Sequence, residues 1–366
     1  MKPRLEHGKY STATSRWAGV GPYYAMFPAD FAMRVVKEYT EEGDMILDPF
    51  AGRATSLYAA ASSDRLGLGV EINPVGWVYG KAKLQTASRN AVESRLRWLG
   101  TKAPKYRAQA AALPEFFRWC YCKSVREFLV AARDLLDWRR RKTDWTTMAL
   151  LLVDLHGKLQ SALSNQMRQT KAMSPQYSIE WWSERDMKPL SHDPVEFMLK
   201  KVAWRYAKGR MKTNESRVYL GDSRERLNVI AKQSGRRAKL LFTSPPYHGV
   251  TNYFYDQWLR LWLLGGPPQP RSPGGECKRK FENRLEYVQM LRTVFTKSKT
   301  LLLRNGVVWV RTAARAFTLE STIEALETSF PEKRLRLEKH SRPTFTQTKL
   351  FDAALKTRGE VDLAMW

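Results

Sequence analysis

Hydrophobic positions near the two ends of the chain fall into short runs that are typical of buried strands. Five such runs cover residues 45–47, 66–70, 217–220, 240–242 and 306–310, and polar or small residues follow each of them. Alternating hydrophobic and polar positions predict two further strands over residues 334–338 and 361–366. Residues 29–39 and 56–61 have the spacing of helices. The sequence therefore predicts an α/β fold with a doubly wound, Rossmann-like sheet.

The middle of the chain has a different pattern, with helical spacing and few strand signals. Apolar residues recur at intervals of three and four over residues 125–138 and 148–163, which predicts two amphipathic helices. The simplest interpretation is a helical insertion between the second and third strands. We therefore expect residues 1–85 and 216–366 to form the two halves of the sheet domain, and residues 86–215 to form the insertion.

The charge of the chain indicates a polyanionic partner. The 366 residues carry a formal net charge of +26, and nucleic acid is the polyanion that such proteins usually bind. Residues 86–215 hold 25 Lys and Arg against 13 Asp and Glu, so the insertion is a candidate DNA target-recognition domain. Its Arg139, Arg140, Arg141 and Lys142 form a candidate phosphate-binding cluster. The alternative for this cluster is a solvated helix end without a ligand.

The turn after the first strand has the composition of a nucleotide-binding turn. It reads Asp48-Pro49-Phe50-Ala51-Gly52-Arg53-Ala54-Thr55 and leads from a strand into a helix. In a doubly wound sheet, such a turn lets the backbone approach a ligand at the carboxyl end of the strand. The next strand ends in Glu71, 23 residues after Asp48, where an acid can accept hydrogen bonds from ribose hydroxyls. A nicotinamide-binding fold would have a similar turn.

A second candidate site follows the strand at residues 240–242. Thr243-Ser244-Pro245-Pro246-Tyr247 ends that strand, and its two prolines fix an extended turn and remove two backbone donors. Ser244 Oγ and the Pro245 carbonyl can accept hydrogen bonds from a planar amine, and Tyr247 can stack on the ring that carries it. An ordinary proline-rich turn is the alternative interpretation.

Together the two motifs resemble those of the DNA methyltransferases that methylate exocyclic amines, at N4 of cytosine or N6 of adenine. The resemblance implies a class I methyltransferase fold with S-adenosyl-L-methionine as cofactor. It also implies the cofactor-binding residues, which are Phe27, Asp48, Pro49, Phe50, Gly52, Thr55, Glu71, Asn73 and Asp222. Ala54 stands where the family usually has a second glycine. Because Ala disfavours positive φ, we expect this position to avoid that conformation.

The resemblance assigns the chemistry to Ser244, Pro245, Pro246 and Tyr247. A Ser at the first position occurs mainly with cytosine in this family, so the expected reaction is methylation of N4 of a cytosine flipped out of double-stranded DNA. Methylation of adenine N6 is the alternative, because Ser can accept from either amine. Two further alternatives are an RNA methyltransferase and a catalytically silent DNA-binding protein. The cofactor turn precedes the catalytic loop, whereas many N4-cytosine enzymes have the opposite order.

A glycine- and proline-rich stretch at residues 265–275 predicts a surface loop after the catalytic segment. It leads into Lys278, Arg279 and Lys280, which are further candidates for phosphate contacts. The alternative is a connection without a ligand.

The remaining features exclude other classes of site. Three cysteines and five histidines without paired spacing predict no metal site. No apolar run is long enough to span a membrane, and residues 1–10 lack the core of a signal peptide, so we expect a cytoplasmic protein. The recognition sequence, a partner restriction nuclease and the oligomeric state are left open by the sequence.

Overall fold

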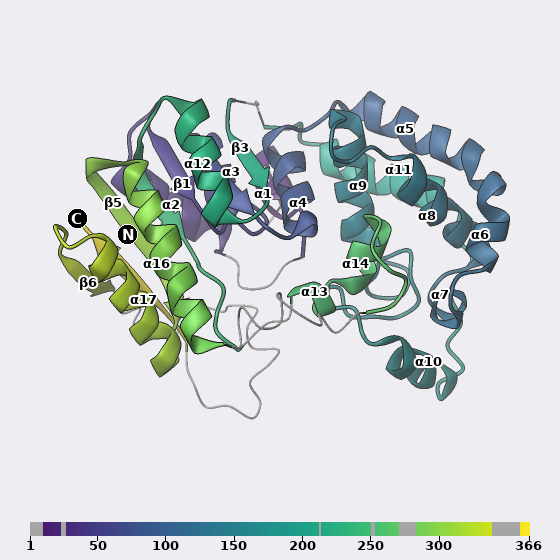
Figure 1. The fold of residues 1–366 in the computed structure, drawn as a ribbon. Helices are drawn as coiled ribbons and strands as arrows, with labels where there is room; N and C mark the ends of the chain where they lie inside the picture. The colour runs from purple at the N-terminus through teal and green to yellow at the C-terminus, as the bar shows by residue number, and fades with distance from the viewer. Residues whose placement is uncertain (1–9, 23–26, 212–213, 250–252, 271–282, 339–358) are drawn as a thin grey trace, which may run out of the picture. The chain divides into compact units, whose positions relative to one another are not determined.

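The computed structural model describes residues 10–22, 27–211, 214–249, 253–270, 283–338 and 359–366. The chain forms two compact units, each assembled from three separate segments (Figure 1). The sheet unit comprises Tyr23–Gly80, Thr213–Asn252 and Ser272–Trp366. The helical unit comprises Met1–Pro22, Lys81–Lys212 and Tyr253–Arg271.

The sheet unit contains one seven-stranded sheet in the order β3-β2-β1-β4-β5-β7-β6. Its strands are β1 (Met45–Asp48), β2 (Leu66–Glu71), β3 (Arg217–Leu220), β4 (Ala238–Thr243), β5 (Leu302–Ala313), β6 (Leu335–Glu338) and β7 (Glu360–Met365). The first five strands in this order pair in parallel, and β7 runs antiparallel to β5 and β6. The predicted α/β class with a doubly wound sheet is confirmed.

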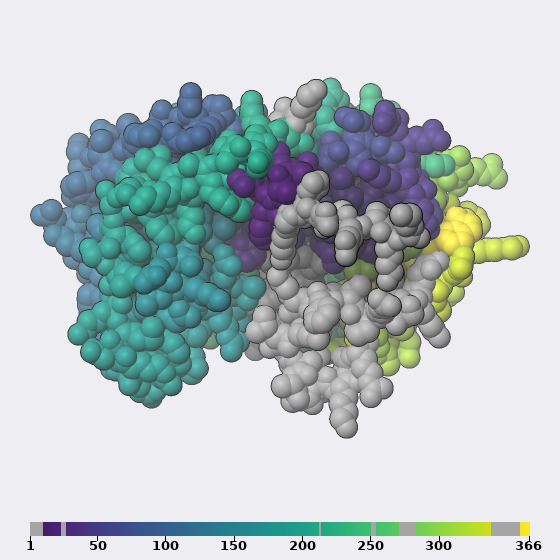
Figure 2. All heavy atoms as spheres, turned by 180° about the vertical axis from the view of Figure 1, so that it is seen from behind, coloured from purple at the N-terminus to yellow at the C-terminus, as the bar shows by residue number. Residues whose placement is uncertain are grey.

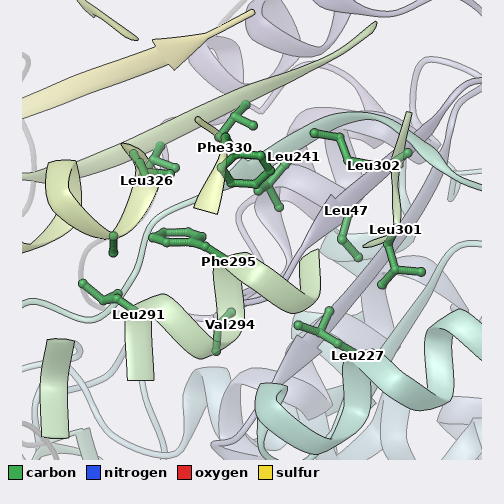
Figure 3. Close-up of a cluster of buried hydrophobic side chains, with 14 of the residues drawn as sticks. Leu47, Leu227, Leu241, Leu291, Val294, Phe295, Leu301, Leu302, Leu326 and Phe330 are labelled. Carbon is green, nitrogen blue, oxygen red and sulfur yellow. The ribbon is translucent and has the colours of Figure 1, made fainter. Parts of the chain in front are cut away.

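Helices cover both faces of this sheet because successive residues of each strand point to opposite sides. Leu47 and Leu241 face one core, together with residues from α12 (Ser223–Ser234), α16 (Arg284–Thr300) and α17 (Ala316–Ser329) (Figure 3). Their neighbours Ile46 and Phe242 face the other core, which α2 (Ala29–Tyr39) and α3 (Thr55–Ala61) complete. Parallel strands buried on both faces read as continuous hydrophobic runs, which is why the sequence revealed them.

The helical unit contains ten α-helices among the described residues, and the surface of those from α5 to α11 is coloured blue to teal where it shows in Figure 2. They are α1 (Ala13–Ala18), α5 (Arg89–Lys102), α6 (Arg107–Ala111), α7 (Glu115–Cys120), α8 (Lys123–Leu135), α9 (Lys142–Asp154), α10 (Pro175–Ser183), α11 (Pro194–Tyr206), α13 (Tyr253–Asp256) and α14 (Trp258–Leu263). The helix α4 (Pro74–Leu84) leads into this unit from the sheet.

Helix α9 differs from its prediction. The prediction of an amphipathic helix over residues 148–163 is wrong, since the helix ends at Asp154 and every residue from Asp144 to Asp154 is buried. Buried Arg260 of α14 donates from Nε to the Leu152 carbonyl at 2.9 Å, so a carbonyl near the end of α9 has a partner from a distant segment. A helix that is apolar on all sides is a core helix.

Segments far from residues 86–215 complete the helical unit. Trp17 of α1 donates from Nε1 to the Gly209 carbonyl at 3.2 Å. Trp258 of α14 donates likewise to the Met173 carbonyl at 3.1 Å, and both tryptophans are buried. No helix in the described part of the chain is long and apolar enough to cross a membrane.

Candidate functional site at the carboxyl ends of β1 and β4

The site begins where the order of the strands reverses. Strand β1 lies between β2 and β4, so the chain leaves it in one direction along the sheet and returns on its other side. Ligands of doubly wound proteins bind at the carboxyl ends of the strands at such a point. Here β1 ends in Asp48 and β4 ends in Thr243, and Thr243 Oγ1 donates to Asp48 Oδ1 at 2.6 Å. The two predicted motifs therefore meet directly.

Asp48 is the buried centre of this junction. It is 1% exposed, and it accepts hydrogen bonds from the Phe50 amide at 3.0 Å and from the Ser56 hydroxyl in α3. Burial raises the pKa of Asp48 from 3.8 to about 6, against the opposing effect of the bonds from Ser56, Thr243 and Phe50. The carboxylate thus connects β1, β4 and α3, and it is charged only above mildly acidic pH.

The turn after Asp48 contains a left-handed alanine. Ala54 has φ 58° and ψ 44° and is fully buried, so the expectation that it avoids positive φ is wrong. Tertiary packing imposes this conformation: Gly52 is also left-handed, and a Cβ on Gly76 of α4 would lie 2.7 Å from the Gly52 carbonyl oxygen. The turn and α4 are in close backbone contact, and a left-handed non-glycine residue persists where its surroundings hold it in this way.

Polar groups beside this turn fit a polar ligand such as S-adenosylmethionine. Thr55 Oγ1 and Asn73 Nδ2 are buried, and neither atom has a hydrogen-bond partner among the described residues. Such groups are costly to leave unpaired, so the ligand's own polar atoms would satisfy them. Glu71 Oε1 accepts from the backbone N–H of Asn73 at 2.7 Å, which fixes the carboxylate at the end of β2. Ile72, between them, is 46% exposed and was not among the predicted site residues, although an exposed apolar side chain at the end of a strand can contact a base.

Asp222 lies at the end of β3, beside β2. It caps α12 by accepting from the Arg224 amide at 2.8 Å, and it forms an ion pair with Arg224 at 2.6 Å. The neighbouring Ser223 donates its hydroxyl to the Pro49 carbonyl, so the end of β3 is joined to the Asp48 turn. Predicted cofactor residues from three neighbouring strands thus lie along one edge of the sheet.

Phe27 precedes α2 and lies on β4. Its ring stacks on Phe242 with centroids 4.4 Å apart, and the side chain is 6% exposed. The ring therefore belongs to the core under the catalytic strand. A contact between Phe27 and the cofactor stays a prediction.

The Ser-Pro-Pro-Tyr loop is held by side chains from α16 and β7. Tyr287 of α16 donates its hydroxyl to the Pro246 carbonyl at 3.0 Å. Tyr247 is 4% exposed, donates to Glu360 Oε1 at 3.0 Å and lies 3.4 Å from Ser244 Oγ, measured between oxygens. Tyr247 thus directs its hydroxyl into the protein. The stacking of its ring on a base remains a prediction.

The sequence analysis missed the residues behind this loop. Arg311 of β5 and Asp362 of β7 form a buried bidentate ion pair with two N to O distances of 2.7 Å. Arg311 Nη1 also lies 3.6 Å from Glu360 Oε2. The available signal was a charged residue within each of two strongly apolar strands, because charges are buried only when they are paired.

The predicted DNA-binding cluster lies in the helical unit. Arg139, Arg140 and Arg141 lie in the turn between α8 and α9, Lys142 is the first residue of α9, and all four are exposed. None of them forms an ion pair within the described residues. Lys278, Arg279 and Lys280 lie outside the described residues.

No metal site emerges from the described side chains. They contain no group of three or more His, Cys, Asp or Glu able to hold an ion, and the cysteines Cys120 and Cys122 are free.

Comparisons with known proteins find a likeness to DNA methylases over part of the chain. Residues 3–75 match the family model described as DNA methylase, N6_N4_Mtase. A segment of 51 residues is 45% identical to the Type II beta methyltransferase M.BslI of Bacillus sp. (strain NEB-606). That match covers 14% of this chain and 6% of the relative, so the chain spans only a small part of the relative's length.

Similar solved structures include TrmN and an rRNA methyltransferase. TrmN from Thermus thermophilus has 10% identity and a TM-score of 0.37 over 96% of this chain and 51% of its own. The rRNA methyltransferase aviRa from Streptomyces viridochromogenes has 12% identity and a TM-score of 0.34 over 96% and 91% of the two chains. Likeness at this level carries no argument about substrate.

Proposed function

We propose that this protein transfers a methyl group from S-adenosylmethionine to an exocyclic amine in double-stranded DNA, because residues 3–75 match the model of the N6/N4 DNA methylase family. The observation that carries the proposal is the hydrogen bond between Thr243 and Asp48. It connects the strand that ends in the cofactor turn to the strand that ends in Ser-Pro-Pro-Tyr. A methyl donor held at the first motif would lie next to an amine held at the second.

The residues at the sheet edge have the chemistry that this cofactor requires. Glu71 can accept hydrogen bonds from the ribose hydroxyls, and Asn73 Nδ2 and Thr55 Oγ1 offer further polar contacts. Ile72 can pack on the adenine. Once bound, the cofactor supplies an electrophilic methyl group on a sulfonium.

The catalytic loop would activate the target amine. An exocyclic amine is a poor nucleophile because its lone pair is delocalised into the ring. Hydrogen bonds from the amine to Ser244 Oγ and to the Pro245 carbonyl favour a pyramidal nitrogen whose lone pair points at the methyl group. In a direct displacement the nitrogen would take the methyl group, S-adenosylhomocysteine would leave and the nitrogen would lose a proton to water. Such a step requires mainly alignment, which can contribute a large part of the acceleration. No covalent intermediate with the enzyme is needed.

We propose cytosine N4 as the target, with adenine N6 as the second candidate. The support for cytosine is the Ser at position 244, since the family pairs Ser mainly with that base. Flipping costs a few kcal/mol of unstacking, which contact with the ring of Tyr247 would partly offset. The basic turn of the helical unit would bind phosphates of the duplex.

The test is transfer of a labelled methyl group. The protein is incubated with tritiated S-adenosylmethionine and unmethylated genomic DNA, and the DNA is digested to nucleosides and separated by chromatography. Label in N4-methylcytidine is expected. Label in N6-methyladenine would leave the proposed fold and mechanism unchanged and would assign adenine as the target base. Label only when RNA replaces DNA would contradict the proposal.

Two variants assign the roles within the site. Ser244→Ala is expected to lose most methyl transfer while keeping its dissociation constant for the cofactor. Glu71→Ala is expected to weaken cofactor binding measured by calorimetry. Cofactor binding without transfer to any nucleic acid would instead support a silent DNA-binding protein.

A further inference from the structure

A row of polar side chains connects the catalytic loop to the buried ion pair of β5 and β7. It runs from Ser244 to Tyr247 over 3.4 Å, from Tyr247 to Glu360 over 3.0 Å and from Glu360 to Arg311 over 3.6 Å. The side chains of Glu360 and Arg311 are 7% and 2% exposed. A buried chain of this kind is costly unless each polar group has a partner, so its retention next to the catalytic loop calls for an explanation.

The charge at the inner end of this row of side chains is fixed by residues of β5 and β7. Burial alone would lower the pKa of Arg311, but the bond to Asp362 and the negative charges of Asp362 and Glu360 hold that pKa above its usual value. The guanidinium is also stacked on Phe31, with Cζ 3.8 Å from the ring centroid. Arg311 is therefore always a cation, and it stabilises the ionised form of Glu360 beside it.

An ionised Glu360 determines the direction of every hydrogen bond in the row. A carboxylate can only accept, so the Tyr247 hydroxyl has to donate to it. The Tyr247 oxygen is then left with lone pairs and can accept the proton of Ser244. Ser244, having given its proton inward, presents only lone pairs to a ligand. The 3.4 Å separation of Ser244 and Tyr247 is long, as is common for catalytic contacts before the substrate is bound.

We propose that Glu360 is a positioning residue for methyl transfer, which orients the hydroxyls of Tyr247 and Ser244 so that Ser244 accepts a hydrogen bond from the target amine. The inference rests on the proposed function. It assigns a role in the reaction to a residue of the last strand, 116 positions after Ser244 in the chain. Glu360 would act through Tyr247 and Ser244.

A neutral amide at this position would reverse the row. In Glu360→Gln, Arg311 can only donate, so the amide oxygen turns to Arg311 and the NH2 group turns to Tyr247. The NH2 donates to the Tyr247 oxygen, the Tyr247 hydroxyl donates to Ser244, and the Ser244 proton points toward the substrate. A donor would then face the amine hydrogens where an acceptor is needed.

The test combines three substitutions and separates turnover from binding. Glu360→Gln is expected to lower kcat by about tenfold or more, while KM for DNA, the dissociation constant for S-adenosylmethionine and Tm change little. Tyr247→Phe removes the connecting hydroxyl, so adding Glu360→Gln to it should cause no further loss. Tyr287→Phe is the matched control, because it removes a hydroxyl of α16 that donates to the Pro246 carbonyl of the same loop, outside the row. Its effect on kcat should add to that of Glu360→Gln.

The outcomes distinguish the inference from the function on which it rests. If the wild-type protein methylates no nucleic acid, the proposed function fails. If the wild type is active and Glu360→Gln has the same kcat, the inference is overturned while the function stands. The inference is also overturned if Glu360→Gln lowers Tm and cofactor affinity in parallel with kcat, or if its effect adds fully to that of Tyr247→Phe, since both results indicate a purely structural role.

Discussion

At the scale of single residues, the proposed cofactor residue Asp48 lowers the stability of the fold at neutral pH. Its pKa of about 6 in the folded protein is above its usual value of 3.8, so folding disfavours the charged form. The cost to stability is absent below pH 4, grows as the pH rises toward 6 and is complete above it, at about 3 kcal/mol. A buried charge that is retained at such a cost indicates a role in binding.

Asp48→Asn is therefore expected to increase the free energy of unfolding at pH 8 and to weaken S-adenosylmethionine binding. The amide oxygen can still accept from Thr243 and Phe50, and the gain in stability, up to about 3 kcal/mol, should vanish near pH 4. Urea unfolding at the two pH values and calorimetry at pH 8 measure both effects. Asp64→Asn, which changes an exposed carboxylate of the same unit, should alter neither. An Asp48→Asn protein less stable than the wild type at pH 8 would contradict this account.

Ala54 makes a second prediction at the residue scale. A left-handed conformation costs a non-glycine residue about 1 to 2 kcal/mol, and the fully buried Ala54 bears this cost in the cofactor turn. Ala54→Gly should remove this conformational cost, but the unfolded chain gains entropy from the glycine and offsets part of the gain. The free energy of unfolding should therefore rise by up to about 1 kcal/mol. The control Ala59→Gly, within α3, should lower it by about 1 kcal/mol. Equal destabilisation of the two variants in urea would show that Ala54 is not strained.

At the scale of elements, the sequence predicted the strands and helices in which buried positions follow a regular pattern. The bounds of α2 and β3 agree with their predictions, β1 and β2 differ by one residue at one end, and β7 is shifted by one residue at both ends. Helix α9 was predicted incorrectly because its neighbours bury it on all sides, which removes the amphipathic signal. The Arg311–Asp362 pair depends on the register of β5 against β7, where these residues are direct partners. No local pattern encodes that register.

The turn before α9 is an element in which charge placement works against local stability. Asp144 accepts from Arg95 Nε at 2.8 Å and from the Asp137 amide at 2.9 Å, which fixes the turn. The exposed cluster from Arg139 to Lys142 then lies at the amino end of the helix, where the dipole disfavours cations. Basic residues held at such an end and without ion pairs are suited to bind phosphate.

Replacing all four residues of this cluster by Ala should weaken DNA binding and reduce its dependence on salt. If each contacts one phosphate, the slope of log K against log salt should fall by about 3 to 4. Titrations of a labelled duplex at several salt concentrations measure the slope. Arg97, Lys123 and Lys200 provide the control, because each pairs with a Glu one helical turn away. An equal loss in both sets would indicate only a general effect of net charge.

At the scale of the whole molecule, two units are interleaved along one chain. Residues 86–215 were predicted as a continuous insertion, whereas the compact helical unit also takes in Met1–Pro22 and Tyr253–Arg271. Local patterns do not reveal this grouping, because it depends on contacts such as those of Trp17 with Gly209 and Trp258 with Met173. The short segment of Trp258–Leu263 follows the catalytic loop in the chain and yet folds with the helical unit.

This division predicts where a bound cofactor stabilises the protein. All of the proposed cofactor residues belong to the sheet unit, so binding should raise the free energy of opening there by about 2.7 kcal/mol at 100 times the dissociation constant. Hydrogen exchange with and without S-adenosylmethionine should therefore show slower exchange in β1, β2 and β4. The amides of α8 and α9 should be unchanged, because their opening exposes no cofactor contact. Protection confined to α8 and α9 would place the cofactor outside the proposed site, and equal protection throughout would mean that the two units unfold as one.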